Sequence, residues 1–166
     1  MLVSGIDSST HLGISLVGNG QIKGKKIEVA QVGFPRLQSI AAEVERTLKI
    51  WQPDFAVVER YAFCRNIDSF ICLVEVGTLV KQVLYNLHIP WAEVSPTMLK
   101  KWVTGNGHAD KEEMARFVES RWGYKSADND IVDSVALAKI GEELGMEGIS
   151  KMLVKKKKKT RKTKCQ

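Results

Sequence analysis

Acidic residues stand at the ends of two apolar segments of this 166-residue chain. Asp7 follows the apolar residues 2–6, and Glu59 ends the run FAVVE at residues 55–59. Asp130 and Asp133 are three residues apart, a spacing that places both side chains on one face of a helix. Carboxylate oxygens suit hard divalent cations, and two such ions can activate water and stabilise a leaving oxygen. The four carboxylates therefore suit two-metal phosphodiester hydrolysis.

Each of these acidic residues also has an ordinary structural explanation. An aspartate after a strand can cap a turn, and aspartates in the first turn of a helix stabilise its dipole. The helix that begins at Asp128 carries Asp130 and Asp133 beside an apolar stripe that includes Ile131 and Val135. No Lys or Arg lies within one turn of either aspartate, and a carboxylate beside a buried stripe is costly unless it is paired or binds metal. Taken together, the four positions favour a metal site.

The elements that must position these carboxylates are predicted from periodicity and turn signals. Strands are expected over residues 2–7, 11–18, 25–34, 55–59 and 90–95, with Asn19-Gly20 as a hairpin turn. Helices are expected over residues 36–51, 68–86, 96–103, 111–122 and 128–144, the last ended by Gly145. This order predicts an α/β fold with a mixed five-stranded sheet flanked by helices, antiparallel at one side and parallel at the other. Parallel neighbouring strands would bring Asp7 and Glu59 to one edge of the sheet.

The charge is unevenly distributed along the chain. The net charge is +6, yet residues 151–166 hold nine basic residues and no acidic one, which leaves a body with a net charge of −3. We therefore divide the chain into a folded domain, residues 1–150, and a basic tail, residues 151–166, that is predicted to be disordered. The tail favours contact with nucleic acid, with an anionic membrane as the second choice. A solubility tail and a nuclear localisation signal are the ordinary alternatives.

Cysteine usage and the first residues of the chain indicate in which cellular compartment the protein is expected. Cys64, Cys72 and Cys165 have no zinc-type or redox-type spacing, and no run of eighteen apolar residues is present. The first residues, MLVS, carry no basic leader. We expect a reduced, intracellular protein without structural zinc, located in the cytoplasm of a bacterial or phage-infected cell.

Five segments, in order, resemble the RuvC family of Holliday-junction resolvases within the RNase H-like superfamily. They are GIDSST from residue 5, IWQPDFAVVER from 50, ERYAFCRNIDS from 59, VTGNGHADKEE from 103 and DNDIVDSVALA from 128. The resemblance implies an RNase H-like fold with Asp7, Glu59, Asp130 and Asp133 as metal ligands. It also implies a catalytic or phosphate-binding lysine, matched by Lys111, and a basic stretch along the DNA backbone, matched by Lys100 and Lys101.

The resemblance further implies a homodimer that places two sites on a four-way junction, with the helix over residues 68–86 as the candidate dimer face. Each site would hold two Mg²⁺ ions, with Mn²⁺ as a substitute, and would leave 5′-phosphate and 3′-hydroxyl ends. The expected DNA contacts outside the carboxylates lie in the loop after Glu59, in the basic stretch and in the tail: Tyr61, Phe63, Arg65, Lys100, Lys101, Lys111, Lys155, Lys156, Lys157, Lys158, Lys159 and Arg161.

The chain departs from the family pattern at two places. Ser8-Ser9 follows Asp7 where Pro-Gly is common, and Ala62 stands where members often carry a base-stacking aromatic. Tyr61 or Phe63 could supply that aromatic, since stacking on a base is worth about 1–3 kcal/mol. A divergent bacteriophage member would fit these differences. Two alternatives share many of these features: another RNase H-like nuclease that cuts RNA–DNA hybrids or flaps, and a junction-binding protein without catalysis.

Overall fold

The computed structural model describes residues 1–9, 11–61 and 66–163, with side chains up to Leu153. The strands in these ranges are β1 Val3–Asp7, β2 Leu12–Gly18, β3 Gln21–Ile27, β4 Phe55–Glu59 and β5 Trp91–Val94. The helices are α1 Gly33–Trp51, α2 Ile67–Asn86, α3 Pro96–Thr104, α4 Lys111–Trp122 and α5 Asn129–Thr163. The expected order of strands and helices is confirmed.

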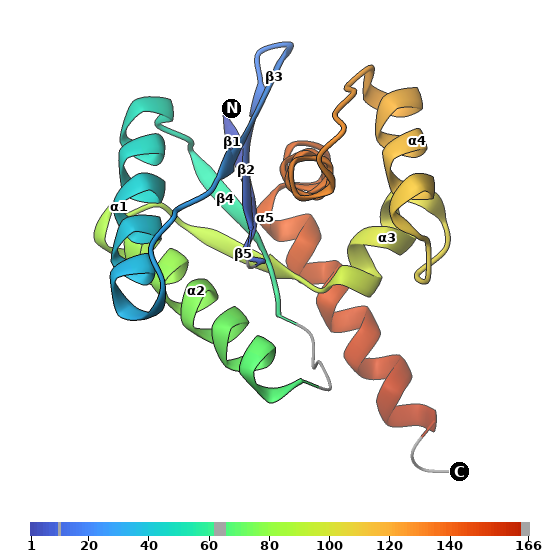
Figure 1. Cartoon of the computed structure of the whole chain (residues 1–166). Coiled ribbons are helices and arrows are strands. Elements are labelled where there is room, and N and C mark those ends of the chain that lie inside the picture. Colours follow the sequence, from blue (N-terminus) through green and yellow to red (C-terminus); the bar gives the residue numbers. More distant parts are fainter. Residues whose placement is uncertain (10, 62–65, 164–166) are drawn as a thin grey trace.

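The strands form one mixed sheet in the order β3-β2-β1-β4-β5. β1 pairs antiparallel with β2 and parallel with β4, and β5 pairs parallel with β4. Helices α1 and α2 cover one face of the sheet, and α3, α4 and α5 lie on the other (Figure 1). The mixed five-stranded sheet flanked by helices is thus the predicted fold.

The predicted two-residue turn joins β2 and β3, but β3 begins earlier than expected. Asn19 and Gly20 have φ angles of 52° and 74°, as a two-residue hairpin turn requires. Pairing therefore begins at once, with Gly18 opposite Gln21, and the strand predicted at residues 25–34 runs instead over residues 21–27. The sequence did not predict the first residues of β3 as strand, because β3 is an edge strand rich in exposed polar groups. Lysine on such an edge discourages pairing with other chains.

The central strand divides two apolar cores. Val3 of β1 packs with α3, α4 and α5, whereas Ile6 packs with α1 and α2. All five residues of β1 are buried, which explains why its sequence does not alternate. No helix in the described part of the chain is both long and apolar enough to cross a membrane.

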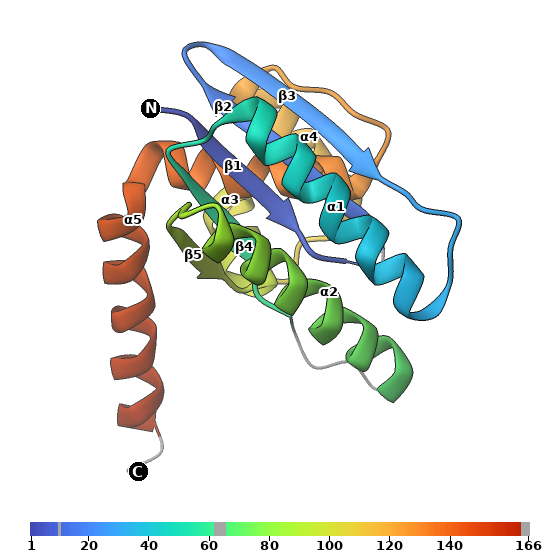
Figure 2. The ribbon, with the colours of Figure 1, turned by 90° about the vertical axis from the view of Figure 1, so that its left-hand side faces the viewer.

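The first segment of the C-terminal helix ends at Gly145, as predicted. At Gly145 the backbone leaves the helical region (φ 62°, ψ 175°), and a second helical segment follows in a new direction (Figures 1 and 2). Ile149 in this segment is fully buried, and Met152 and Leu153 pack against the core, so packing extends beyond the predicted boundary at residue 150. Helical backbone then continues to Thr163. Lysine is a good helix former, and lengthening an existing helix adds one hydrogen bond per residue.

Candidate active site

The four predicted carboxylates converge at one end of the sheet. Asp7 ends β1 and Glu59 ends β4, and the parallel pairing of Ile6 with Val58 places the two acids at the same edge. The first turn of α5 lies at this edge, because the carbonyl oxygen of Asp130 stands 2.0 Å from the point that a Cβ on Gly13 would occupy, and Gly13 pairs with Asp7. The charges of Asp130 and Asp133 accordingly raise the pKa of Asp7, after burial and the charge of Glu59. Residues 120 or more positions apart in the sequence thus share one electrostatic environment.

The approach of α5 to the sheet depends on glycines. A Cβ atom on Gly13 would stand 2.0 Å from the carbonyl oxygen of Asp130, and one on Gly5 would stand 1.9 Å from that of Ser134. The hydroxyl of Ser15 donates a hydrogen bond of 2.8 Å to the same Ser134 carbonyl. The backbone of α5 therefore contacts the backbones of β1 and β2 directly, which fixes the depth at which Asp130 and Asp133 enter the site.

Asp128 has a different role from the two aspartates that follow it. Its carboxylate accepts hydrogen bonds from the backbone N–H groups of Asp130 (2.9 Å) and Ile131 (3.3 Å), so it caps α5. It also pairs with Lys26 of β3 at 2.8 Å. The hydrogen bond from Lys26 is the largest of the interactions that lower the pKa of Asp128. Asp128 is thus a charged, satisfied cap that ties α5 to β3.

Burial and mutual repulsion disfavour charge on the clustered carboxyls. Burial first, then the charges of Glu59, Asp133 and Asp130, raise the pKa of Asp7 well above its ordinary value. Burial, followed by the charge of Asp133, raises the pKa of Glu59 to about 7. Burial likewise raises the pKa of Asp133 to about 6. The ionised cluster therefore requires a cationic partner near neutral pH.

The chemistry of the cluster fits divalent cations. Oδ1 of Asp7 is buried and has no hydrogen-bond partner, although buried carboxylate oxygens are normally satisfied. All the donors are carboxylate oxygens, the type that Mg²⁺ prefers. Within the described residues, no three His, Cys, Asp or Glu side chains already stand as a complete metal-ligand set. The fit thus rests on the unsatisfied oxygen and on the donor type, and side-chain rotation would have to complete the coordination.

Two lysines, one on α3 and one on α4, carry positive charge that acts on the carboxylates. Lys100 of α3 and Lys111, the first residue of α4, both lower the pKa of Asp133, and Lys100 also lowers that of Glu59. The family resemblance implied a role near the cut for Lys111 but placed Lys100, like its neighbour Lys101, only along the DNA backbone. Lys100 is half-buried and Lys101 is exposed, so the structure distinguishes two neighbours that the sequence does not.

Ser8, the unexplained neighbour of Asp7, joins the ends of two strands. It is buried, and its hydroxyl lies 3.5 Å from the carbonyl oxygen of Glu59, the limit of a hydrogen bond. It also lies beside Gly77 of α2, 3.8 Å from where a Cβ atom would stand. Ser8 therefore fills the space between β1, β4 and α2 directly behind the carboxylates. The sequence did not predict these contacts.

The predicted DNA contacts are only partly described. Tyr61 packs edge-on against Phe70, with ring centroids 6.1 Å apart, and the Lys81 ammonium lies 5.2 Å from the Tyr61 ring centroid. Its ring is thus held against α2, which does not test stacking on a base. Phe63 and Arg65 lie outside the described residues, as do the side chains of Lys155, Lys156, Lys157, Lys158, Lys159 and Arg161.

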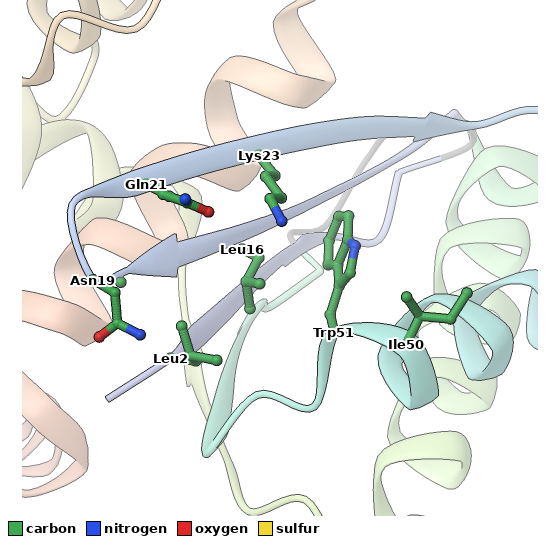
Figure 3. Close-up of a pocket in the computed structure, with 8 residues that line it drawn as sticks. Leu2, Leu16, Asn19, Gln21, Lys23, Ile50 and Trp51 are labelled. Carbon is green, nitrogen blue, oxygen red and sulfur yellow. The ribbon is translucent and has the colours of Figure 1, made fainter.

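A pocket of about 300 Å³ lies at the other end of the sheet. Leu2, at the start of β1, and Trp51, at the end of α1, form its apolar wall, and Lys23 lies on its rim (Figure 3). No carboxylate, histidine or cysteine lines it. This pocket lacks the groups needed for the hydrolysis considered above, so the carboxylate cluster remains the candidate active site.

Comparisons with known proteins identify the family to which the chain belongs. The family model described as "Crossover junction endodeoxyribonuclease RuvC" matches residues 4–140. A relative of that name from Prochlorococcus marinus (strain NATL1A) is 31% identical over 156 residues, which cover 85% of this chain and 97% of the relative. The structure described as "T. thermophilus RuvC in complex with Holliday junction substrate" matches with a TM-score of 0.77 and 26% identity, over 89% of this chain and 97% of that one. The matched region contains both strand-end carboxylates and the Asp-x-x-Asp helix, and the chain belongs to the RuvC family.

Proposed function

We propose that this protein is a metal-dependent endonuclease that resolves Holliday junctions and related branched DNA. The observation that carries the proposal is the convergence of Asp7, Glu59, Asp130 and Asp133 at one sheet edge in a member of this family. The reaction would place symmetric nicks with 5′-phosphate and 3′-hydroxyl ends during DNA recombination, repair or phage DNA processing, in the cytoplasm.

Each carboxylate has a place in the proposed site. Two Mg²⁺ ions, with Mn²⁺ as a substitute, would supply Lewis acidity and an activated water when bound. Asp7, with its unsatisfied oxygen at the centre of the cluster, would hold both ions, and Glu59, Asp130 and Asp133 would complete the set. The core fixes the positions of these side chains on two strands and one helix, so they would hold the ions in place against the scissile phosphate.

The lysines would act on the substrate rather than on the ions. Lys100 and Lys111 are the cations that approach Asp133, so they would pair with the scissile phosphate where it meets the carboxylates. Lys101, Tyr61, Phe63 and Arg65 are proposed to contact the DNA further from the cut. Lys155 to Lys159 and Arg161 are proposed to contact the phosphate backbone of one duplex arm.

A homodimer would let one protein cut two strands of a junction, because a two-fold axis presents two identical sites. Apolar side chains are exposed on α2 at Ile67 (70%) and Ile71 (49%). Val32 and Phe34, beside the start of α1, are exposed by 82% and 68%. Phe34 and Cys72 of α2 line the same surface hollow, so these side chains form one apolar surface, here called the α1–α2 surface, which is the proposed dimer face.

The test compares a labelled four-way junction with an RNA–DNA hybrid, each incubated with Mg²⁺, Mn²⁺ or Ca²⁺. Paired symmetric nicks in the junction with Mg²⁺ or Mn²⁺ are the expected result. Cleavage of the hybrid alone would make the protein another RNase H-like nuclease. Tight junction binding without cleavage under any of the three ions would make it a structure-specific binding protein.

A further inference from the structure

A cluster of four side chains joins α3, α4 and α5 on the side away from the carboxylates. The indole rings of Trp102 and Trp122 stack with centroids 5.8 Å apart. The Arg121 guanidinium lies 4.8 Å from the Trp102 centroid and 4.6 Å from the Trp122 centroid. Glu143 of α5 accepts a hydrogen bond of 3.0 Å from Nε1 of Trp122 and pairs with Arg121 at 3.4 Å. We call these four residues the Trp–Arg clasp.

The clasp makes directional contacts that the apolar core does not. The Arg121 guanidinium donates hydrogen bonds of 3.2 Å to the carbonyl oxygens of both Trp102 and Val103, near the C-terminal end of α3. Elsewhere α3 and α4 are held by buried aliphatic side chains such as Leu99 and Met114, whose contacts have little directional preference. A planar guanidinium that stacks and donates in a fixed fork therefore fixes the rotation of α3 against α4.

That rotation determines where Lys100 points. Lys100 and Trp102 are two residues apart on α3, so they project from the axis about 200° apart. Glu59 at the end of β4 pairs with Val94 of β5, and α3 begins two residues later at Pro96, so α3 starts at the edge of the sheet that carries the carboxylates. Holding Trp102 against Arg121 and Trp122 therefore turns the half-buried Lys100 to the opposite side of α3. The same clasp holds the C-terminal end of α4, whose first residue is Lys111.

We infer that Arg121 is a positioning residue for cleavage, which holds Lys100 and Lys111 over the carboxylate site through the Trp–Arg clasp. This inference rests on the proposed function and adds to it a residue remote from the carboxylates. The contacts of Arg121 are with Trp102, Val103, Trp122 and Glu143, none of which is a proposed metal ligand, so it acts through the two lysines. A displacement of about 1 Å at a reacting centre can lower a rate by about 10²-fold, so a loosened clasp would slow cleavage without abolishing binding.

The experiment is a double-mutant cycle measured by single-turnover junction cleavage in Mg²⁺. R121M should lower the cleavage rate by on the order of ten-fold, and should change the junction dissociation constant in Ca²⁺ by less than about three-fold. In a background where Lys100 and Lys111 are both Met, the same substitution should lower the rate by less than about two-fold, because the groups through which it acts are gone. R121K, which keeps the charge but lacks the planar fork, should give an intermediate rate.

Two further variants make the result decisive. R46M removes another surface arginine, paired with Glu43 on α1, and should leave the rate unchanged. E143Q removes the negative charge of the clasp and leaves the stacked rings in place, so it tests the clasp even if R121M unfolds. Its loss of cleavage rate should also be smaller when Lys100 and Lys111 are replaced. An equal loss of rate with and without the lysines would mean that Arg121 only stabilises the fold, and would overturn the inference. A wild-type protein that cuts no junction would instead overturn the proposed function.

Discussion

The carbonyl oxygen of Asp130 lies 2.0 Å from the point that a Cβ atom on Gly13 would occupy. No side chain larger than hydrogen can stand at residue 13 while the first turn of α5 keeps its place over β2. The position of two proposed metal ligands, Asp130 and Asp133, thus depends on the absence of a side chain in a strand more than one hundred residues earlier.

Gly13→Ala should therefore displace the start of α5 and separate its aspartates from Asp7. We expect a loss of about 1–3 kcal/mol in the free energy of unfolding, as for other overpacked sites, and a larger proportional loss of cleavage. Urea unfolding and single-turnover cleavage measure the two effects. Gly77→Ala is the matched control, because its nearest contact would be an ordinary 3.5 Å and it lies within a helix. Equal activity of both variants would contradict the tight approach of α5.

Metal-free protein should become less stable as the pH rises from about 4 to about 7. The pKa values of Glu59 and Asp133 rise on folding from 4.5 and 3.8 to about 7 and about 6. A raised pKa stabilises the folded state fully below the unfolded-state value, and this stabilisation is lost as the pH rises through the folded-state value. Over this window the loss should amount to on the order of a few kcal/mol.

Thermal unfolding in EDTA at a series of pH values tests this expectation, and added Mg²⁺ or Ca²⁺ should restore the stability lost near pH 7. Glu59→Gln should reduce the pH dependence in EDTA. Glu43→Gln should leave it unchanged above about pH 5, since hydrogen bonds from Arg46, then Lys25, lower the pKa of Glu43 to about 2 and its contribution is lost only at lower pH. A metal-free protein with flat stability between pH 4 and 7 would argue against a buried carboxylate cluster.

Asp7→Asn should abolish cleavage while preserving junction binding. The substitution keeps the shape of the side chain but removes a metal-binding oxygen at the centre of the cluster, where losses of at least about 10²-fold are expected. Junction affinity in EDTA should be equal or higher, because one negative charge near the phosphate is gone. Gel-shift and single-turnover assays separate the two effects, with Asp128→Asn as a control for a cap. Undiminished cleavage by the Asp7 variant would end the metal-site proposal.

Ile71→Glu should weaken the proposed dimer without unfolding the subunit. Ile71 is 49% exposed on the α1–α2 surface, and a charge there would be desolvated only in the dimer. Light scattering should show a lower mass at micromolar concentrations, and paired nicking should change to independent single nicks. Ile50→Glu, at a more exposed apolar position (65%) beyond that surface, is the control. An unchanged mass for Ile71→Glu would place any dimer face elsewhere.

Deletion of residues 154–166 should weaken junction binding and flatten its salt dependence. Each lost phosphate contact removes about 0.9 from the slope of log K against log salt. The cut follows Leu153 because Ile149, Met152 and Leu153 belong to the core, and a cut after residue 150 would also remove part of that packing. Binding titrations from low to moderate salt measure the slope, and thermal unfolding checks the body. An identical slope would leave the tail as a solubility segment.

The sequence by itself determined the order of elements and the identity of the four acids. Buried strands end in Asp7 and Glu59, Asn19-Gly20 specifies a two-residue turn, and Asp110 and Gly123 bound α4 as capping residues should. These signals are local: each depends on the conformational preference or the polarity of a few neighbouring residues. Local signals were weakest where exposed polar residues form a strand, and the start of β3 was therefore predicted too late.

Only the tertiary structure decided which charged residues face one another. Asp128 and Asp130 are nearly adjacent, yet Lys26 from a distant strand makes the first a paired cap and leaves the second among like charges. Lys100 and Lys101 cannot be distinguished by sequence, and the packing of α3 turns one of them toward Asp133. Such choices depend on the rotation and depth of whole helices, which are set by glycine contacts and by clasps between segments far apart in the chain. Electrostatic interactions follow distance in space, and that distance exists only after folding.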